Sequence, residues 1–262
     1  MPRYDFRSPR LYVDAPLAAG QPVALDRDQA NYLVNVLRLE RGGEALLFNG
    51  RDGEWRARLS GSGKRSLAAE PVEQTRPQPP AGDLHFLFAP LKHARLDYLV
   101  QKAVEMGASR LQPVTTRHTQ VSRINLDRMH ANAIEAAEQC GVLNLPEIAA
   151  PLSFDVLMTV ADPDRLLVFC DEEAEVKDPV AALAAARPSQ SGLLWTDATG
   201  ASQPLAVLIG PEGGFAEEER AALLKRANVV RLALGPRILR ADTAAVAALA
   251  MVQAVLGDWR AN

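Results

Sequence analysis

Two short apolar runs toward the end of the chain are each followed at once by a Gly-Pro pair. Leu205–Ile209 leads into Gly210-Pro211, and Val229–Leu234 leads into Gly235-Pro236. Runs that are apolar at every position, with a helical segment between them, are typical of neighbouring strands buried on both faces of a parallel sheet. Ligands of open α/β sheets bind beyond the carboxyl ends of the strands. The pattern therefore predicts a ligand site at the two Gly-Pro turns.

The same pattern occurs earlier in the chain. The segments Leu84–Pro90, Arg110–Val114 and Leu166–Cys170 are predicted to be further strands. Apolar residues at helical spacing between positions 96 and 106 predict a helix. Strands that alternate with helices favour an α/β domain with a parallel sheet, and we expect this domain to cover residues 83–262.

The first 70 residues have a different pattern. Apolar and polar residues alternate in Arg10–Val13 and in Trp55–Leu59, whereas Asp28–Leu39 places its apolar residues on one helical face. Short strands with one helix predict a small β-barrel over residues 1–70. The Pro-rich segment 71–82 is expected to be a semi-rigid linker between the two domains.

Composition predicts a soluble protein. Hydrophobic residues make up 48% and charged residues 23% of the 262 residues, as in ordinary globular proteins. The chain starts without an apolar signal core, and its longest apolar run, Ala244–Leu256, is too short to cross a bilayer. Cys140, Cys170 and the four histidines show no metal-ligand spacing. We therefore expect a cytoplasmic protein with no membrane segment and no metal site.

Charge is distributed unevenly along the chain. The net charge of -3 combines +5 in residues 1–130 with -8 in residues 131–262. Such asymmetry is typical of a protein in which one half faces a polyanion, although scattered surface charge would give the same totals. Seven Lys or Arg residues against three Asp or Glu residues between positions 90 and 130 favour a polyanion track in that segment.

The first Gly-Pro turn has the composition of a ligand loop but not of a phosphate loop. Its glycines allow the backbone to bend sharply and to approach a ligand. Three carboxylates, Glu217, Glu218 and Glu219, follow in the next helix and would repel a phosphate, and no Lys-Ser or Lys-Thr pair follows the glycines. A tight structural turn remains the alternative. The second turn lies in the apolar segment LGPRILR, and two such loops side by side would suit an uncharged ring.

These two segments, GPEGGF and LGPRILRADTA, resemble the signature of the SPOUT methyltransferases. More narrowly, they are similar to the family that methylates N3 of a uridine in 16S ribosomal RNA. The resemblance implies a SPOUT α/β domain with a deep trefoil knot over residues 205–262 and a PUA-like RNA-binding domain over residues 1–70. It also implies S-adenosylmethionine (SAM) as the cofactor, small-subunit ribosomal RNA as the substrate, and a homodimer. The apolar stripe Val246, Leu249, Ala250 and Leu256 would contribute to the dimer interface, or would cover the sheet of its own subunit.

The resemblance also suggests which residues form the sites. The cofactor is expected to contact the two Gly-Pro loops and the start of the last helix: Leu208, Gly210, Pro211, Glu212, Gly213, Gly214, Leu234, Gly235, Ile238, Leu239, Arg240, Thr243 and Ala244. Seven basic side chains are expected to contact RNA: Arg10, Arg38, Lys92, Arg95, Lys102, Arg117 and Arg123.

Two residues are candidates for the chemistry at the uracil. N3 must lose a proton before it can attack, so a fixed cation near O2 or O4 would stabilise the developing charge. Arg240 is the first choice for that cation, and a structural bond to backbone carbonyls is its alternative. Asp242 is the second candidate, because it could orient Arg240 or help remove the proton, although helix N-capping is the simpler role.

The chain departs from the family pattern at four positions. Asn31 stands where relatives usually have His, Val142 where they have Arg, Ala216 where they have a Ser N-cap, and Asp242 where they have Glu. Ala216 should weaken the helix cap by roughly 1 kcal/mol. The missing Arg removes one basic contact, and the shorter acid makes a direct base role for Asp242 less favourable.

Other functions remain open on the residues alone. A related SPOUT enzyme could methylate a ribose 2′-oxygen or guanine N1 instead. A non-catalytic ribosome-assembly factor could bind RNA without needing SAM. An enzyme that acts on nucleotide phosphates is disfavoured, because the Gly turn lacks a Lys and is followed by three carboxylates.

Overall fold

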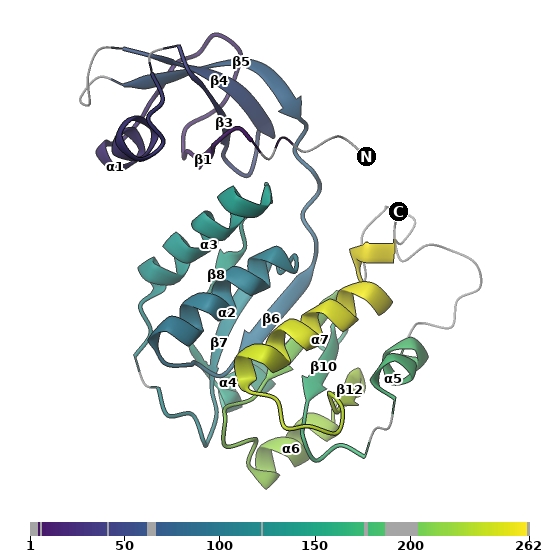
Figure 1. The fold of residues 1–262 in the computed structure, drawn as a ribbon. Helices are drawn as coiled ribbons and strands as arrows, with labels where there is room; N and C mark the ends of the chain where they lie inside the picture. Colours follow the sequence, from purple (N-terminus) through teal and green to yellow (C-terminus); the bar gives the residue numbers. More distant parts are fainter. Residues whose placement is uncertain are drawn as a thin grey trace. The chain divides into compact units, whose positions relative to one another are not determined.

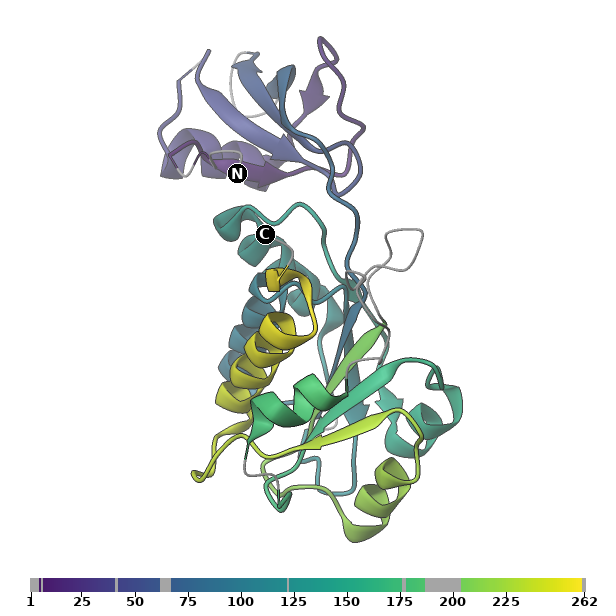
Figure 2. The same ribbon diagram turned by 90° about the vertical axis from the view of Figure 1, so that its right-hand side faces the viewer.

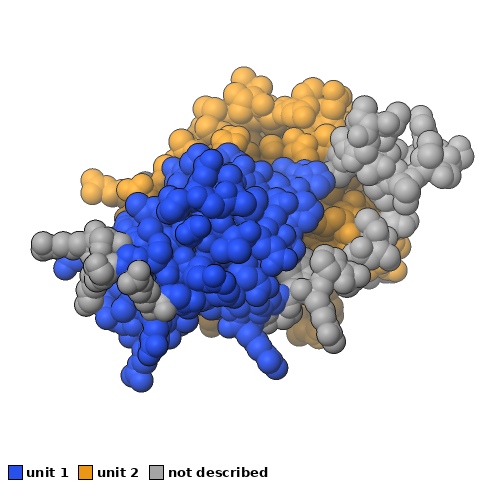
Figure 3. All heavy atoms as spheres, turned by 90° about the horizontal axis from the view of Figure 1, so that it is seen from above, with its two compact units in different colours: residues 1–81, 134–145 blue, residues 82–133, 146–262 orange. Residues whose placement is uncertain are grey.

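The structure is a computed structural model that describes residue 5 and residues 7–40, 42–61, 67–121, 123–175, 178–186 and 204–260. The chain forms two compact units, which Figure 3 shows in different colours. Unit 1 contains residues 1–81 and 134–145, and unit 2 contains residues 82–133 and 146–262. A short stretch from the middle of the chain therefore belongs to the N-terminal unit.

Unit 1 is built on a five-stranded sheet with the order β1-β3-β4-β5-β2. Its strands are β1 (Arg10–Tyr12), β2 (Val23–Ala24), β3 (Glu44–Phe48), β4 (Glu54–Ser60) and β5 (Ala68–Arg76). β1 pairs parallel to β3, and the other pairs are antiparallel. Alternate residues of β3 and β4, including Leu47, Ala57 and Leu59, form the apolar core of this unit. The sheet agrees with the small β domain predicted from alternation.

The segment expected to be a linker is partly a strand. β5 continues through Pro71 to Arg76, and only residues 77–83 lack regular structure. Proline is tolerated here because β2 pairs with β5 only at Ala68 and Ala69, so the rest of β5 lies at the sheet edge. The register shift of β4 between Arg56 and Ala57 lies directly opposite Pro71.

The predicted helix over residues 28–39 is present but irregular. α1 (Arg27–Asn31) starts with a capping box, in which Asp26 accepts hydrogen bonds from the N–H groups of Asp28 and Gln29. The chain then changes to a π-helix, η1 (Tyr32–Val36). Two residues later Arg38 has a positive φ of 56°, which is uncommon for a residue with a side chain. Ala30 and Leu33 are both fully buried, and Leu33 anchors this segment to the core.

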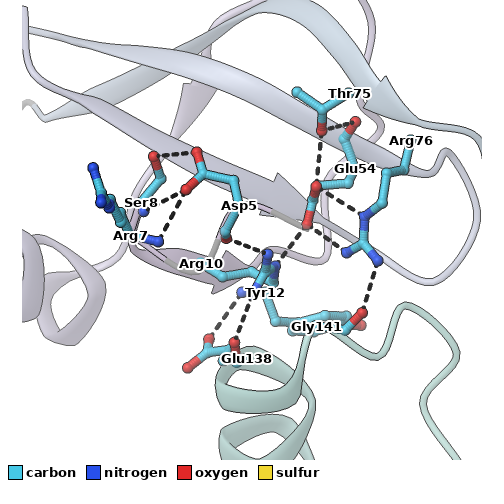
Figure 4. Close-up of polar contacts among 10 residues, drawn as sticks. All are labelled: Asp5, Arg7, Ser8, Arg10, Tyr12, Glu54, Thr75, Arg76, Glu138 and Gly141. Atoms are coloured by element: carbon cyan, nitrogen blue, oxygen red, sulfur yellow. Dashed lines mark hydrogen bonds and ion pairs between the residues drawn. The ribbon is translucent and has the colours of Figure 1, made fainter. Parts of the chain in front are cut away.

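A buried carboxylate connects three parts of unit 1 (Figure 4). Glu54 accepts hydrogen bonds from Arg10 Nε at 2.6 Å, from Arg76 Nε at 3.0 Å and from Thr75 Oγ1 at 2.8 Å. The side chains of Arg10 and Glu54 are only 4% and 3% exposed. The expectation that Arg10 contacts RNA phosphate was therefore wrong, because its guanidinium is enclosed and neutralised within the fold.

The same arginines bind the end of helix α3 (Leu126–Cys140), whose last residues belong to unit 1. Arg10 Nη1 donates to the carbonyl oxygen of Glu138 at 3.2 Å, and Arg76 Nη1 donates to that of Gly141 at 3.0 Å. The Glu138 carboxylate accepts the N–H of Tyr12 at 2.9 Å (Figure 4). Carbonyl groups at a helix C-terminus have no partner within the helix, so these contacts satisfy them.

Unit 2 contains a seven-stranded sheet of parallel pairs, with the order β12-β10-β11-β6-β7-β8 and with β9 on β7. Its strands are β6 (Leu84–Phe88), β7 (Arg110–Thr115), β8 (Glu147–Ile148), β9 (Leu152–Ser153), β10 (Leu166–Cys170), β11 (Leu205–Ile209) and β12 (Val229–Leu232). All five residues of β10 and of β11 are buried. The parallel α/β sheet predicted from the apolar runs is confirmed.

Helices cover both faces of this sheet (Figures 1 and 2). Besides α3, they are α2 (His93–Glu105), α4 (Phe154–Val160), α5 (Pro179–Ala185), α6 (Glu217–Leu224), α7 (Ala241–Val255) and the 3-10 turn η2 (Asp258–Arg260). Phe154, Leu157 and Leu223 of α4 and α6 pack with Phe169 and Leu208 of the sheet. α2 and α7 contact each other on the opposite face (Figure 1). Among the described residues, no helix combines the length and apolar character needed to cross a membrane.

Part of the expected dimer stripe on α7 is used within the chain itself. Leu249 and Leu256 are 1% and 2% exposed, whereas Val246 and Ala250 are half-buried. The homodimer stays a prediction. The trefoil knot also stays a prediction, because the chain path into β11 runs through residues 187–203, which lie outside the described residues.

We predict that Glu54→Gln destabilises the protein by about 3 kcal/mol, because it leaves two arginines without their shared buried anion. Burial alone would raise the pKa of Glu54, but hydrogen bonds from Arg76, Arg10 and Thr75 outweigh it and hold the pKa below its ordinary value of 4.5. The stabilisation is therefore complete above pH 4.5 and is lost as the pH falls through the lower folded pKa.

Urea denaturation at several pH values measures this effect. The control is Arg51→Gln, which removes the exposed pair with Asp14, whose side chains are 54% and 83% exposed. That change should cost no more than about 0.5 kcal/mol. Equal losses for the two variants would contradict the structural role assigned to Glu54.

Candidate active site

A cavity of about 520 Å³ lies at the carboxyl ends of β10, β11 and β12. Its walls come from the residues that follow these strands and from the start of α7. The lining residues are Cys170, Asp171, Glu172, Ile209, Gly210, Pro211, Glu212, Gly213, Leu232, Ala233, Leu234, Gly235, Pro236, Arg237, Ile238, Leu239, Arg240, Ala241 and Ala244. The cavity is in the size range of small-molecule and cofactor sites. It lies where the apolar strands and Gly-Pro turns predicted a ligand.

The first Gly-Pro loop requires its glycines for packing reasons. A Cβ atom on Gly210 would lie 2.8 Å from the ring of Phe215, which is 4% exposed and stacks edge-on against Phe169. Gly214 has a φ of 69°, and a Cβ atom there would overlap the Glu172 carboxylate. The backbone of this loop is therefore held close to the core on one side and to the pocket wall on the other.

A cluster of ion pairs supports the pocket at Asp171, the residue that follows the carboxyl end of β10. The Asp171 side chain is fully buried and pairs with Arg220 Nε at 3.0 Å and with Arg231 Nη2 at 2.6 Å. Arg220 comes from α6 and Arg231 from β12, so one carboxylate connects three elements around the pocket. Two guanidinium groups neutralise Asp171, which fits a structural role at this position.

The second Gly-Pro loop is more open. Ile238 is 94% exposed, and Arg237 and Arg240 are exposed as well. Arg240 occupies the N-cap position of α7. Among the residues that the structure describes, its side chain forms no ion pair or hydrogen bond, so the alternative of a structural bond to backbone carbonyls finds no support there. Its guanidinium is accessible at the pocket.

Asp242 does not have the predicted capping role. α7 starts at Ala241, and Asp242 lies in its first turn, where a carboxylate interacts favourably with the helix dipole. The carboxylate accepts the N–H of Thr243 at 2.9 Å and lies 3.5 Å from Arg95 Nε. Its cationic neighbour is therefore Arg95, and not Arg240 as expected from the sequence.

The outer side of the first loop is held by two segments that come from elsewhere in unit 2. Arg95 in α2 forms an ion pair with Glu212. The ring of His118 is hydrogen-bonded through Nδ1 to the carbonyl oxygens of Gly213 and Gly214 at 3.1 and 3.2 Å. Both partners are acceptors, so Nδ1 must carry the proton.

The helix after this loop keeps one half of a capping box, the half that does not need a Ser side chain. Ala216 has no side-chain acceptor, but Glu219 accepts the N–H of Ala216 at 3.0 Å. The other oxygen of Glu219 accepts the N–H of Arg117 at 2.8 Å. Glu219 is buried, with 9% of its surface exposed. Its two hydrogen bonds connect the start of α6 to the loop after β7.

Most of the residues expected to bind the cofactor lie at this pocket. Of that set, Leu208 is buried inside β11, and Gly214 and Thr243 do not line the cavity. The segment from Cys170 to Glu172 was not among the expected cofactor contacts. Its signal was present, because Leu166–Cys170 was predicted to be a parallel strand and these residues follow its carboxyl end.

A second cavity, of about 290 Å³, is separate from these loops. Its lining is largely apolar and includes Leu87, Leu157 and Leu167, together with Arg110 and Arg165. None of the residues of the two Gly-Pro loops contributes to it. The pocket at the strand ends therefore remains the candidate active site.

Comparison with known proteins identifies the family. A family model described as an RNA methyltransferase domain matches residues 77–253, and a model described as an RNA methyltransferase PUA domain matches residues 25–72. The chain belongs to this RNA methyltransferase family. A relative from Synechocystis, named ribosomal RNA small subunit methyltransferase E, is 31% identical over 252 residues, which are 94% of this chain and 78% of the relative.

Two solved structures are similar to this RNA methyltransferase. A methyltransferase from Legionella pneumophila, solved with bound SAM, has a TM-score of 0.78 and 28% identity, covering 96% of this chain and 99% of that one. The ribosomal RNA small subunit methyltransferase E of Neisseria gonorrhoeae, solved with bound SAM, has a TM-score of 0.80 and 25% identity. The match covers 97% of this chain and 100% of the Neisseria chain.

The basic residues expected to contact RNA fall into two groups in the methyltransferase. Arg38, Lys92, Arg117 and Arg123 are exposed, and their side chains form no ion pair among the described residues. Arg95 and Lys102 are partly buried and paired. Lys102 Nζ lies 2.7 Å from Glu105 Oε1 and 5.5 Å from the ring centre of Tyr98. The first group is free to meet a polyanion, whereas the second group already has anionic partners.

The hydrogen bonds around two of the residues that depart from the expected family pattern can be described. Asn31 ends α1, and its side-chain oxygen accepts a hydrogen bond from Asn35 Nδ2 at 2.5 Å. Val142 is half-buried just after α3, where its N–H donates to the carbonyl oxygen of Ala137 at 3.1 Å. Among the described residues, neither side chain has a contact that would replace the one expected from the family resemblance.

We predict that Cys170 of the methyltransferase resists thiol reagents in the native state. Burial, reinforced by the neighbouring Asp171 carboxylate, raises the pKa of its thiol to about 12. At pH 8 only roughly one such thiol in 10,000 is ionised, and the thiolate is the reactive form. Cys140 is exposed. Labelling kinetics should therefore show one fast thiol, which Cys140→Ser removes, and a second thiol that reacts only in denaturant. Fast native labelling of Cys140→Ser would contradict this prediction.

Proposed function

We propose that this RNA methyltransferase uses SAM to methylate N3 of a uridine in small-subunit ribosomal RNA. The observation that carries the proposal is the pocket formed by the two Gly-Pro loops, GPEGGF and LGPRILR, at the ends of adjacent parallel strands. Relatives named for the small-subunit ribosomal RNA, and similar structures solved with SAM, support this choice of substrate and cofactor.

The residues of the pocket fit SAM in size and charge. The volume of about 520 Å³ suits a ligand with an adenine, a ribose and an amino-acid chain. Ile209, Leu232 and Leu234 give the wall an apolar part for the ring, while the loops offer backbone groups. Glu172 also lines the pocket and has no ion pair among the described residues. A carboxylate there suits a cofactor that carries a positive sulfonium and a positive ammonium group.

The protein's task in this reaction is to position the base and to stabilise charge. Bound SAM would supply an activated methyl group. Uracil N3 becomes nucleophilic as its proton leaves, and negative charge then develops on O2 and O4. Arg240 is accessible at the pocket and is not engaged by another described side chain, so it is suited to stabilise this charge.

Asp242 is less suited to remove the N3 proton. Its carboxylate is 18% exposed and already accepts a backbone N–H and a guanidinium contact. Both carboxylate oxygens are therefore already occupied, Oδ1 by the Thr243 N–H and Oδ2 by the Arg95 guanidinium. We therefore assign Asp242 to the support of the pocket.

RNA would be held by exposed cations in both units. Arg117, Arg123 and Lys92 belong to unit 2, and Arg38 lies in the PUA-like unit 1. Lys102 would add a weaker contribution because Glu105 neutralises it. N3 is on the Watson–Crick edge, so the target uridine must be unpaired or turned out of its helix. We further infer a cytoplasmic homodimer, in which the half-buried residues of α7 contribute to the interface.

The function is tested by methyl transfer from labelled SAM to unmodified small ribosomal subunits and to naked small-subunit RNA. Nucleoside analysis of the product should give 3-methyluridine. Label on a ribose or on guanine would replace the proposed target but keep the enzyme class. A protein that binds RNA without binding SAM would instead favour the assembly-factor alternative.

We predict that Arg240→Ala lowers kcat by about 100-fold, as expected when a donor to a developing oxyanion is removed. Arg240→Lys should recover part of the loss, because it restores the charge but not the planar fork. The control is Lys225→Ala, which removes an exposed cation that does not line the pocket and should leave kcat unchanged. An Arg240→Ala enzyme with normal kcat would exclude this role.

A further inference from the structure

We propose that Arg95 is a positioning residue of the SAM pocket that holds both Gly-Pro loops in place. The inference rests on the proposed function, because it assigns SAM to this pocket. It differs from the role suggested by the sequence, which was a contact to RNA phosphate. The difference follows from the partners of Arg95 in the fold.

Arg95 connects two pieces of chain that are far apart in sequence. Its guanidinium forms an ion pair with Glu212, in the loop after β11, and its Nε lies 3.5 Å from Asp242 Oδ2, in the first turn of α7. Glu212 lines the SAM pocket, and Asp242 lies two residues beyond Arg240, which also lines it. One side chain therefore fixes the positions of both walls.

The backbone of Arg95 is itself well anchored. Arg95 lies in the first part of α2, and the next residue on that helix, Leu96, is 9% exposed, followed by Leu99 at 2%. α2 packs against α7 within unit 2. The guanidinium is 31% exposed, Glu212 50% and Asp242 18%, so the contacts are only partly screened by water.

The positions of Glu212 and Asp242 depend on Arg95, because both carboxylates share its guanidinium. Without the cation, the carboxylates of Glu212 and Asp242 would be two like charges that no longer share a positive partner, and like charges repel. Glu212 lies in a loop that has no helix or strand structure to resist that repulsion. A pocket that must be reassembled on binding loses affinity relative to one that is already in the bound shape.

The loop after β11 is held by a second set of contacts besides Arg95. His118 holds the carbonyl oxygens of Gly213 and Gly214, and Glu219 ties the following helix to the N–H of Arg117. A small recess of about 110 Å³ lies among Lys92, Arg95, His118 and Glu212. The outer side of the SAM loop is therefore built from the segment whose exposed cations are proposed to meet RNA.

The charge balance argues against Arg95 as a phosphate contact. Its two carboxylate partners leave the three side chains with a net charge of -1, and a phosphate would have to displace one of them. Lys92 is nearby in the same recess, is exposed, and has no ion pair among the described residues. Loss of Arg95 should therefore weaken SAM binding, whereas loss of Lys92 should weaken RNA binding.

The test compares Arg95→Gln with Lys92→Gln in the full chain. SAM affinity is measured by calorimetry, and RNA affinity is measured over a range of salt concentrations with unmodified small-subunit RNA. Arg95→Gln should weaken SAM binding by about 10-fold, within the usual range of coupling between sites. It should leave the salt dependence of RNA binding unchanged. Lys92→Gln should bind SAM normally and should lower the slope of log K against log salt by about 0.7 to 0.9.

Two further variants separate positioning from a general loss of structure. Glu212→Gln removes one carboxylate, so the double variant Arg95→Gln, Glu212→Gln should bind SAM no more weakly than Arg95→Gln alone. Arg95→Lys keeps the charge but loses the planar fork, and its SAM affinity should fall between those of the wild type and Arg95→Gln. If Arg95→Gln proves unstable in a thermal melt, the comparison of Arg95→Lys with the wild type carries the test.

The outcomes distinguish this inference from the proposed function. If the wild type binds SAM and Arg95→Gln binds it equally well, while the salt slope falls, Arg95 is a phosphate contact and the inference is overturned. If the wild type itself fails to bind SAM, the proposed function fails, and this inference fails with it. A loss of SAM affinity with an unchanged salt slope supports both.

Discussion

Burial of the central strands on both faces is the constraint on which the rest of this structure depends. β10 and β11 are buried at all five positions, so neither strand has room for a solvated polar side chain. Polar groups and sharp turns are therefore confined to the strand ends, where three neighbouring strands place their loops together. The pocket, the glycines that border it and the ion pairs around Asp171 all follow from that arrangement.

Elements with a strong local pattern could be predicted from the sequence. The runs at Leu205–Ile209 and Leu166–Cys170 became strands with the expected bounds, because continuous apolar sequence has few other stable solutions in a protein of this size. Most of the two Gly-Pro loops was also assigned to the pocket. The segment that follows β10 was not assigned, although the same rule about strand ends applied to it.

Features that depend on distant partners could not be predicted in this way. Arg10 has the sequence signature of any surface cation, and its burial is decided by Glu54, 44 residues further along the chain. Arg95 meets Glu212 across 117 residues. Pro71 suggested a linker because its neighbours in the sheet are not visible in the sequence. The short pairing with β2 and the register shift opposite Pro71 explain why the strand tolerates it. A charged residue shows what it can bind, but the fold determines which partner it meets.

The position of residues 134–145 has a consequence for the modularity of the chain. The N-terminal unit is not encoded by one continuous piece of sequence, because the carbonyl groups that receive Arg10 and Arg76 come from the end of α3. A gene fragment that stops at residue 81 would encode all five strands of its sheet but would leave both guanidinium groups without those acceptors. Recombination that exchanged only the N-terminal segment would separate the same partners. The N-terminal unit therefore depends for its contacts on residues 134–145, which lie inside the match to the RNA methyltransferase domain at residues 77–253 and outside the match to the PUA domain at residues 25–72.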